Sequence, residues 1–424
     1  MRDALLHRAC DDVDIACSAT WEQSESVFTA TGCSCYRTGV KHGTLTVKVD
    51  GSLFEITSYR SDGTYSDGRH PDQVKFVKSI EEDLARRDFT INAMAYHPTR
   101  GLLDPYHGRD DLDSRLIRCV GCANRRFSED ALRILRAARF ESQLGFSLEA
   151  ETAHAMLALA PGLHHVAVER QLQEWNKLLC GTHVRTCLMD NIDMLGIMIP
   201  ELLPMKGFDQ RTPFHCYDVL EHTAYVVELV DSTPRQRWAA LLHDIGKPEV
   251  FTVDKNGQGH FKGHPAASET IAKKVTKRFK MSKDFSRDVV QLVALHDIGL
   301  IARPNEVKRA IMRFNNDPEL FRDLCKLKRA DAIARTTLYG RPRVQKAEDL
   351  LACLDHVLKS NEPYCRAMLA IDGSDLITLG MQPGPQVGKV LDFLLDATID
   401  AEVPNTREAL LAFASTHLQE AAEI

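Results

Sequence analysis

The sequence predicts an α+β protein, in which a small N-terminal α/β head is followed by an all-α neck and a long helical body. Two observations give this fold class. Short β-branched runs are concentrated in residues 1–100, and from Ser128 onward apolar residues recur mainly at helical spacing. The chain of 424 residues is also long enough for more than one hydrophobic core.

The strand signals are clearest in one predicted hairpin of the head. Leu45–Val49 and Leu53–Thr57 are short runs rich in β-branched and apolar residues, and Asp50-Gly51 between them is a typical hairpin turn. Val74–Val77 predicts a further strand. The sequence therefore places a small sheet in the head.

The helical signals begin with an apparent helix start. Ser128, followed by the acidic Glu129 and Asp130, predicts an N-cap with acids in the first helical turn. Leu132 and Leu135 then continue an apolar face at helical spacing. We expect helices from here to the C-terminus.

Composition is that of an ordinary globular protein. Hydrophobic residues make up 44% of the chain and charged residues 26%, and the net charge of −6 argues against indiscriminate binding to nucleic acid. No apolar run approaches the roughly 20 residues that a membrane span needs, and the N-terminus lacks the features of a signal peptide. We expect a cytoplasmic protein whose 12 scattered cysteines are reduced thiols.

The first motif that suggests chemistry is Asp12-Val13-Asp14. On a strand, residues i and i+2 point to the same face, so two carboxylates could hold divalent metal ions for phosphoryl transfer. Glu55, on the later predicted strand, could add a third carboxylate. By itself this pattern is weak, because it is common by chance on protein surfaces.

The second motif is the string from Arg86 to Ala93. The paired guanidinium groups of Arg86 and Arg87 suit triphosphate oxygens, and Asp88 and Asn92 can hydrogen-bond ribose hydroxyls. The alternative is a helix start with surface arginines.

The third motif contains Glu129, Asp130, Arg133 and Arg136. On a helix, Asp130 and Arg133 would lie one turn apart on one face, where a carboxylate and a guanidinium could read the edge of C or A without a template. The alternative is a surface salt bridge of little energetic value.

Together and in this order, these strings resemble the head and neck of class II tRNA nucleotidyltransferases, the CCA-adding enzymes of the polymerase-β-like superfamily. The resemblance extends over nearly the whole chain and includes Arg2–Leu6, Thr38–Thr44, Asp104–Leu112, Val168–Glu174, Gly373–Leu376 and Gly380–Gly388. It implies template-independent addition of C, C and A to the 3′ end of tRNA from CTP and ATP, with Mg²⁺ in the head.

The resemblance also implies roles for individual residues. It assigns metal binding to Asp12 and Asp14, and base reading to Asp130 and Arg133 with support from Glu129. The residues that would serve the nucleotide phosphates and their surroundings are Arg2, Arg86, Arg87 and Arg136.

One departure from the family pattern concerns the start of the chain. The family has a strand and a Gly-Gly turn just upstream of the position of Met1, and these glycines let the backbone approach the nucleotide phosphates. Either the start codon is placed too late or the head is N-terminally truncated. We therefore expect weak or no transferase activity from the chain as given, and a strand carrying Asp12 and Asp14 at the edge of the sheet.

A second constellation lies between residues 215 and 331. His222, the adjacent pair His243-Asp244, and Asp331 offer imidazole nitrogens and hard oxygens suited to Mn, Ni, Mg or Fe. Their order resembles the HD phosphohydrolase superfamily, some of whose members hydrolyse 2′,3′-cyclic phosphates or phosphomonoesters. His264 and His296 would be extra ligands or phosphate contacts. The alternative for each histidine alone is a core position with its hydrogen bonds satisfied.

These observations divide the chain into four segments: a head (1–120), a helical neck (121–205), an HD-type metal-binding region (206–345) and a body and tail that bind tRNA (346–424). Alternative functions are a bacterial poly(A) polymerase or a specialised CC- or A-adding enzyme. A different class is an HD phosphohydrolase with an impaired RNA-binding head. The expected partners are tRNA, CTP and ATP, with no membrane and no obligatory protein partner.

Overall fold

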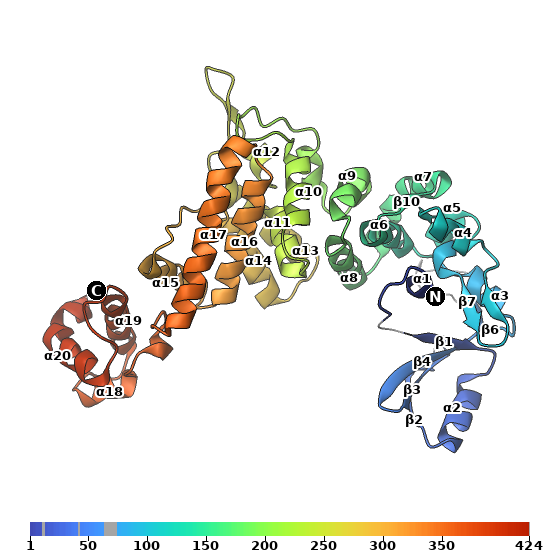
Figure 1. The fold of residues 1–424 in the computed structure, drawn as a ribbon, viewed down its shortest axis with the longest axis horizontal. Coiled ribbons are helices and arrows are strands. Elements are labelled where there is room, and N and C mark those ends of the chain that lie inside the picture. The colour runs from blue at the N-terminus through green and yellow to red at the C-terminus, as the bar shows by residue number, and fades with distance from the viewer. Residues whose placement is uncertain (11–12, 41–42, 63–73, 424) are drawn as a thin grey trace. The chain divides into compact units, whose positions relative to one another are not determined.

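The computed structural model describes the backbone of residues 1–10, 13–40, 43–62 and 74–423 (Figure 1). The chain separates into two compact units. The first contains residues 1–203 together with 278–280, and the second contains residues 204–277 and 281–424. The predicted α+β class is confirmed, because the longer strands lie in the first unit and helices dominate the rest.

The sheet of the first unit has four strands in the order β1-β4-β3-β2. Strand β1 (Asp14–Cys17) runs parallel to β4 (Ser52–Ser58) and forms one edge, as expected from the sequence. Strands β3 (Thr44–Val49) and β2 (Ser34–Gly39) complete the sheet in antiparallel register. The predicted hairpin is confirmed, with its turn at Asp50-Gly51 between β3 and β4.

One face of this sheet is covered by helix α2 (Trp21–Ala30), which Thr20 begins with a capping box. Leu45, Val47 and Ile56 point toward the helix and form a small core. Because side chains alternate along a strand, the residues between them point to the opposite, open face.

The remaining elements of the first unit are short strands and helices. They are α1 (Arg2–Leu5), β5 (Arg60–Asp62), β6 (Val74–Phe76), α3 (Ile80–Ala85), η2 (Thr90–Asn92), β7 (Ala95–His97), β8 (Gly101–Leu103), α4 (Gly108–Asp113), β9 (Leu116–Ile117), α5 (Ala123–Glu129), α6 (Leu132–Leu144), β10 (Ser147–Leu148), α7 (Ala150–Leu159), η3 (Ala160–His165), α8 (Val168–Leu179) and α9 (Val184–Leu195). The strand predicted at Val74–Val77 is β6, which pairs with β5.

The helix predicted to start at Ser128 does not start there. Ser128 lies in the last turn of α5, and the chain breaks at Asp130, where φ is −146° and ψ is 103°, before α6 begins at Leu132. Glu129 is the last residue of α5, and Asp130 lies between α5 and α6, so neither belongs to a first helical turn.

The second unit is almost entirely helical. Its elements are α10 (Val219–Leu229), α11 (Pro234–Leu242), α12 (Lys247–Val250), β11 (Thr252–Val253), β12 (Gly259–His260), α13 (His264–Arg278), α14 (Lys283–Leu295), α15 (Pro304–Arg313), α16 (Pro318–Ile333), α17 (Thr337–Ser360), η5 (Arg366–Met368), α18 (Gly373–Thr378), α19 (Pro385–Ile399) and α20 (Arg407–Glu423), and η4 (Pro200–Met205) spans the boundary between the units.

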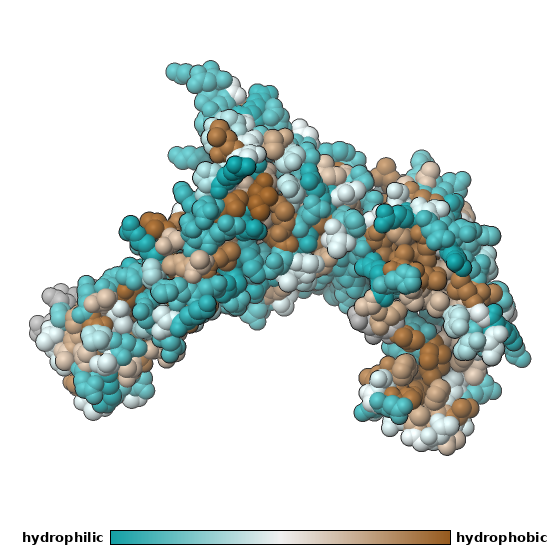
Figure 2. Space-filling model, in the orientation of Figure 1, coloured by the Kyte–Doolittle hydropathy of each residue, from teal (hydrophilic) through white to brown (hydrophobic). Residues whose placement is uncertain are grey.

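Two groups of helices pack together in the described part of this unit. Helices α10, α11, α14 and α16 pack on one another, and α18, α19 and α20 enclose a separate apolar cluster. The outer surface in view is mainly hydrophilic, with apolar residues gathered in limited patches (Figure 2). Among the described residues, no helix is both long and apolar enough to cross a bilayer.

Candidate functional sites

The open face of the head sheet carries two of the predicted carboxylates. Asp14 is the first residue of β1, and the parallel register pairs it with Glu55 on β4. Both side chains are exposed and share one face on neighbouring strands about 4.8 Å apart. Asp12 lies outside the described residues. Asp14 and Glu55 are thus placed where a divalent ion could be held.

A second group in the head is built around Asp88. This buried carboxylate accepts hydrogen bonds from Asn92 Nδ2 (3.1 Å) and Arg136 Nε (2.8 Å), and Asn92 Oδ1 accepts one from Arg2 Nη1 (2.8 Å). Burial acts to raise the pKa of Asp88, but Arg136 and the hydrogen bonds outweigh it and lower the pKa to about 2. Asp88 is therefore ionised, and it fixes Arg136 and Asn92.

The arginine pair is organised by an acid that the sequence analysis missed. Asp83 on α3 is buried, and its carboxylate lies 2.8 Å from Arg86 Nη2 and 3.6 Å from Arg87 Nη2. Its spacing, three and four residues before the arginines on a helix, is the signal that could have identified it.

The break between α5 and α6 carries the proposed base readers. Glu129 accepts hydrogen bonds from Arg126 Nη1 (2.7 Å) and Arg133 Nη1 (2.8 Å), while Arg133 Nη2 also donates to the Arg86 carbonyl oxygen (3.1 Å). Asp130 is paired with Arg170 of α8, at 2.9 Å. Asp130 and Arg133 are therefore not partners, and the alternative of an i, i+3 salt bridge between them is wrong.

In the second unit, six predicted residues converge from different elements. Their ligand atoms form two groups that share Asp244: His222, His243, Asp244 and Asp331 in one, and Asp244, His264 and His296 in the other. His222 Nε2 lies 3.1 Å from Asp331 Oδ1, and His264 Nε2 lies 3.4 Å from Asp244 Oδ1.

The backbone orients all four imidazoles in the same way. Nδ1 of His243, His264 and His296 each contacts the carbonyl oxygen three residues earlier, and Nδ1 of His222 contacts the Ala334 carbonyl oxygen. A carbonyl oxygen only accepts, so each Nδ1 carries a proton, and in a neutral ring Nε2 then has a lone pair directed at the cluster. His243 Nε2 and Asp244 Oδ2 are buried without a hydrogen bond. This donor set fits a cation.

Burial sets the charges of these groups. It lowers the pKa of His222, and it lowers that of His296 to about 3, so both rings are neutral near pH 7. Burial acts to raise the pKa of Asp331, but Arg335 and His222 hold it well below its usual range. Neutral imidazoles and ionised carboxylates are the forms that bind metal ions.

Comparison with known proteins identifies the family. The model of the poly A polymerase head domain matches residues 1–118, that of a probable RNA- and SrmB-binding site of polymerase A matches 145–205, and that of a putative tRNA nucleotidyltransferase domain 2 matches 265–414. A CCA-adding enzyme from Streptococcus pneumoniae serotype 19F (strain G54) is 33% identical over 417 residues, covering 97% of this chain and 90% of the relative.

The chain belongs to the family of CCA-adding enzymes. A further member, from Geobacillus thermodenitrificans (strain NG80-2), is 33% identical over 97% of this chain and 90% of its own length. The solved Bacillus stearothermophilus CCA-adding enzyme in complex with CTP has a TM-score of 0.72 at 29% identity, covering 100% of this chain and 92% of that chain. The class II resemblance found in the sequence is thereby confirmed.

Three residues around the cluster of possible metal ligands were not identified from the sequence. The ring of His215 packs edge-on against His222, with centroids 5.0 Å apart. Lys247 Nζ lies 2.6 Å from Asp244 Oδ2, although its hydrogen bond goes to Gln210 Oε1. Lys247 follows Asp244 by three residues, a spacing visible in the sequence.

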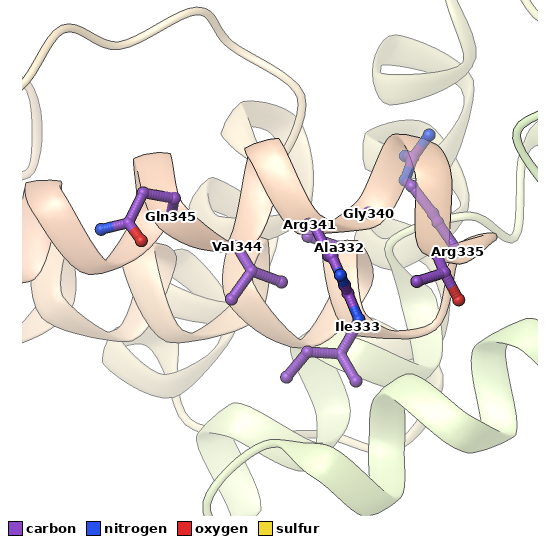
Figure 3. Close-up of a pocket in the computed structure, with 8 residues that line it drawn as sticks. Ala332, Ile333, Arg335, Gly340, Arg341, Val344 and Gln345 are labelled. Carbon is purple, nitrogen blue, oxygen red and sulfur yellow. The ribbon is translucent and has the colours of Figure 1, made fainter.

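The third residue, Arg335, forms an ion pair of 2.8 Å with Asp331. It also borders a pocket of about 410 Å³ between α16 and the start of α17. In Figure 3 the Arg335 guanidinium points away from Ile333 and Val344, which line this pocket. None of the six possible metal ligands lines this pocket.

Proposed function

We propose that this protein adds C, C and A to the 3′ end of tRNA from CTP and ATP, without a nucleic-acid template. The observation that carries the proposal is the register of Asp14 opposite Glu55 on the open face of the head, in a chain that belongs to the CCA-adding enzymes. The terminal 3′-oxygen of tRNA attacks the α-phosphorus of the incoming nucleotide, and pyrophosphate leaves.

In this proposal, Asp14 and Glu55, with Asp12, hold Mg²⁺ ions. When bound, such ions activate the 3′-hydroxyl and offset the charge of the triphosphate. Arg2, Arg86, Arg87 and Arg136 surround the phosphates. Asp88 acts through Arg136 and Asn92, because its own oxygens are occupied by them and by the Phe89 amide.

In the same proposal, Asp130 and Arg133 read the base. They do not form an ion pair with each other. Each is held by a different partner, Asp130 by Arg170 and Arg133 by Glu129, so the two reading groups are fixed independently. A carboxylate and a guanidinium fixed in this way offer an acceptor and donors to a base edge.

The test is to incubate the protein with tRNA that lacks its 3′ end, with CTP, ATP or both, and to sequence the products, which detects even slow addition. We expect CCA when both nucleotides are present. A tail of A residues on RNAs of any kind would instead indicate a poly(A) polymerase, and products that stop after CC, or that gain only A, would indicate a specialised enzyme. Since the substrates are found in the cytosol, we expect the protein there.

We also propose that residues 206–345 form an HD-type phosphohydrolase domain. Support comes from six possible ligands, among which His243 Nε2 and Asp244 Oδ2 are buried without hydrogen bonds. Because Asp244 belongs to both ligand groups, it would help to hold an ion in either of them. Four imidazole nitrogens favour Mn, Ni or Fe over Mg. Such ions lower the pKa of bound water and supply a hydroxide nucleophile.

This activity is tested with a 2′,3′-cyclic nucleotide and p-nitrophenyl phosphate, each in the presence of Mn²⁺, Ni²⁺, Fe²⁺ or Mg²⁺. Elemental analysis of the purified protein measures bound metal in parallel. If the protein binds metal but hydrolyses neither compound, the site is a structural metal site and the phosphohydrolase proposal is contradicted. Hydrolysis without nucleotide addition to tRNA would favour the alternative in which the head only binds RNA.

A further inference from the structure

A row of side chains crosses the open face of the head sheet and ends at the carboxylates. The strand registers pair Tyr36 with Thr46, Thr46 with Glu55, and Glu55 with Asp14. Register partners on neighbouring strands point to the same face. One aromatic ring, one hydroxyl and two carboxylates therefore lie side by side, from β2 to β1.

Tyr36 is not part of the core. Its side chain is 46% exposed, and α2 packs against the other face of the sheet. No hydrogen bond or ring contact of Tyr36 is found among the described residues. An exposed aromatic ring without partners, in line with a candidate catalytic pair, points to a ligand.

Lys48 adds a positive charge to the same face. It lies two residues beyond Thr46 on β3, so its side chain points to the open face, and it is exposed. In the part of the chain that the structure describes, Lys48 forms no ion pair. The open face thus offers a stacking surface and a cation beside two acids.

We propose that this row binds the 3′-terminal nucleotide of the tRNA substrate. The base of that nucleotide stacks on Tyr36, its 5′-phosphate lies near Lys48, and its 3′-hydroxyl reaches Asp14 and Glu55. Strands β2 and β4 are two strand spacings apart, about 10 Å, a gap that one nucleotide can bridge with the help of the Tyr36 side chain. The proposal rests on the nucleotide-adding function stated above.

The chemistry of the reaction explains why an aromatic ring suits this place. During CCA addition the terminal base of the substrate is first that of the unextended tRNA and then an added cytosine, so the site must hold different bases in the same position. Hydrogen bonds to a base edge would favour one base, whereas stacking on an aromatic ring tolerates all of them. Tyr36 would therefore position the growing end without selecting it.

The experiment compares Tyr36→Ala and Tyr36→Phe with Tyr96→Ala. Tyr96 on β7 is the matched control, because its side chain is 59% exposed and it lies outside the four-stranded sheet. We expect Tyr36→Ala to lower kcat/KM for tRNA by roughly 5- to 150-fold, the range of one base–aromatic stack, while CTP affinity is unchanged. Tyr36→Phe keeps the ring and should stay near wild type, as should Tyr96→Ala.

A substrate change tests the same contact without depending on the folding of a variant. A tRNA whose terminal nucleotide is abasic should be a poorer substrate for the wild-type protein by a similar factor, and Tyr36→Ala should show no further loss on it. If Tyr36→Ala lowered kcat/KM on the abasic tRNA by the same factor as on normal tRNA, the two effects would be independent, and the stacking contact would be overturned. Lys48→Gln should reduce the salt dependence of tRNA binding, and an unchanged slope would remove Lys48 from the site.

These outcomes separate the two proposals. If the wild-type protein adds no nucleotides to tRNA, the proposed function fails. If it adds CCA and Tyr36→Ala has wild-type kcat/KM, only the assignment of the row fails.

Discussion

His243 Nε2 lies 3.2 Å from Asp244 Oδ2, and neither atom takes part in a hydrogen bond. The Nδ1 proton of His243 is used by the Ala240 carbonyl oxygen, at 2.7 Å. Two buried lone-pair atoms facing each other repel unless a cation or a proton lies between them. This relationship is the basis for the first two predictions.

Removing the pair should remove the metal. We predict that His243→Ala, and separately Asp244→Asn, will lose metal bound to the second unit and any phosphatase activity, while CCA addition survives because the head has its own carboxylates. Elemental analysis and the two activity assays measure this. His260→Ala is the control, since His260 is a half-exposed histidine paired with Asp254, away from the cluster. Loss of CCA addition in a folded variant would contradict the independence of the two sites.

Metal binding should release a proton from His243. Burial acts to lower the pKa of His243, but Asp244 outweighs it and raises the pKa, whereas burial lowers the pKa of His296 to about 3. The raised pKa of His243 favours its protonated form, so metal and proton compete for this ring and metal affinity should rise with pH as that proton is lost. Calorimetry in buffers of different ionisation enthalpy counts the protons. Release of three or more would mean that the other rings are also charged.

The head carboxylates should be needed for chemistry and not for RNA binding. We predict that Asp14→Asn or Glu55→Gln abolishes CMP and AMP addition, because metal ions would lose a ligand, while tRNA affinity changes little. Gel-shift and addition assays separate the two effects. Asp50→Asn, in the exposed turn of the same sheet, is the matched control. Turnover retained by both site variants would exclude these residues from the mechanism.

Arg133 should decide nucleotide choice. Arg133→Ala is predicted to reduce discrimination of CTP and ATP against UTP and GTP by about 1–3 kcal/mol, the usual value of lost contacts to a base edge. Arg125→Ala provides a close control, because Arg125 also pairs with Glu129 but its side chain is 74% exposed. Ratios of kcat/KM for the four nucleotides measure the effect. An equal loss of discrimination in both variants would show that Glu129, rather than Arg133, is the critical group.

Glu141 on α6 should make the first unit less stable as pH rises. Burial raises its pKa from 4.5 to about 7, although Asn191 donates a hydrogen bond to it. Between these values the folded state binds more protons than the unfolded state, so the free energy of unfolding falls as pH rises from 4.5 toward 7.

Glu141→Gln should therefore raise the free energy of unfolding of this unit at pH 8 by up to about 3 kcal/mol and leave its stability at pH 4 unchanged. Hydrogen exchange of the α6 amides at both pH values measures this. The exposed Glu151→Gln on α7 is the control. If the Glu141→Gln variant lost as much protection between pH 4 and pH 8 as the wild type does, the role of Glu141 would be contradicted.

Much of the fold follows from local patterns in the sequence. The hairpin of β3 and β4 was predicted because alternation and the Asp50-Gly51 turn depend on neighbours along the chain. The helix start at Ser128 was predicted wrongly because its cause is not local. Asp130 is held by Arg170, 40 residues away, and Glu129 by arginines on both sides of the break. The four-segment division of the chain stays a prediction.

The sequence by itself determined which residue types are present for two sites and in what order they occur. Only the tertiary structure decided which of them meet: Asp14 with Glu55 through a parallel register, Asp130 with Arg170, and His264 and His296 with Asp244. The same registers placed Tyr36 in line with the carboxylates. The physical reason is that a ligand set is fixed by the packing of elements far apart in the chain, and by the backbone carbonyls that orient each imidazole, whereas sequence spacing determines only what lies along one strand or one helix.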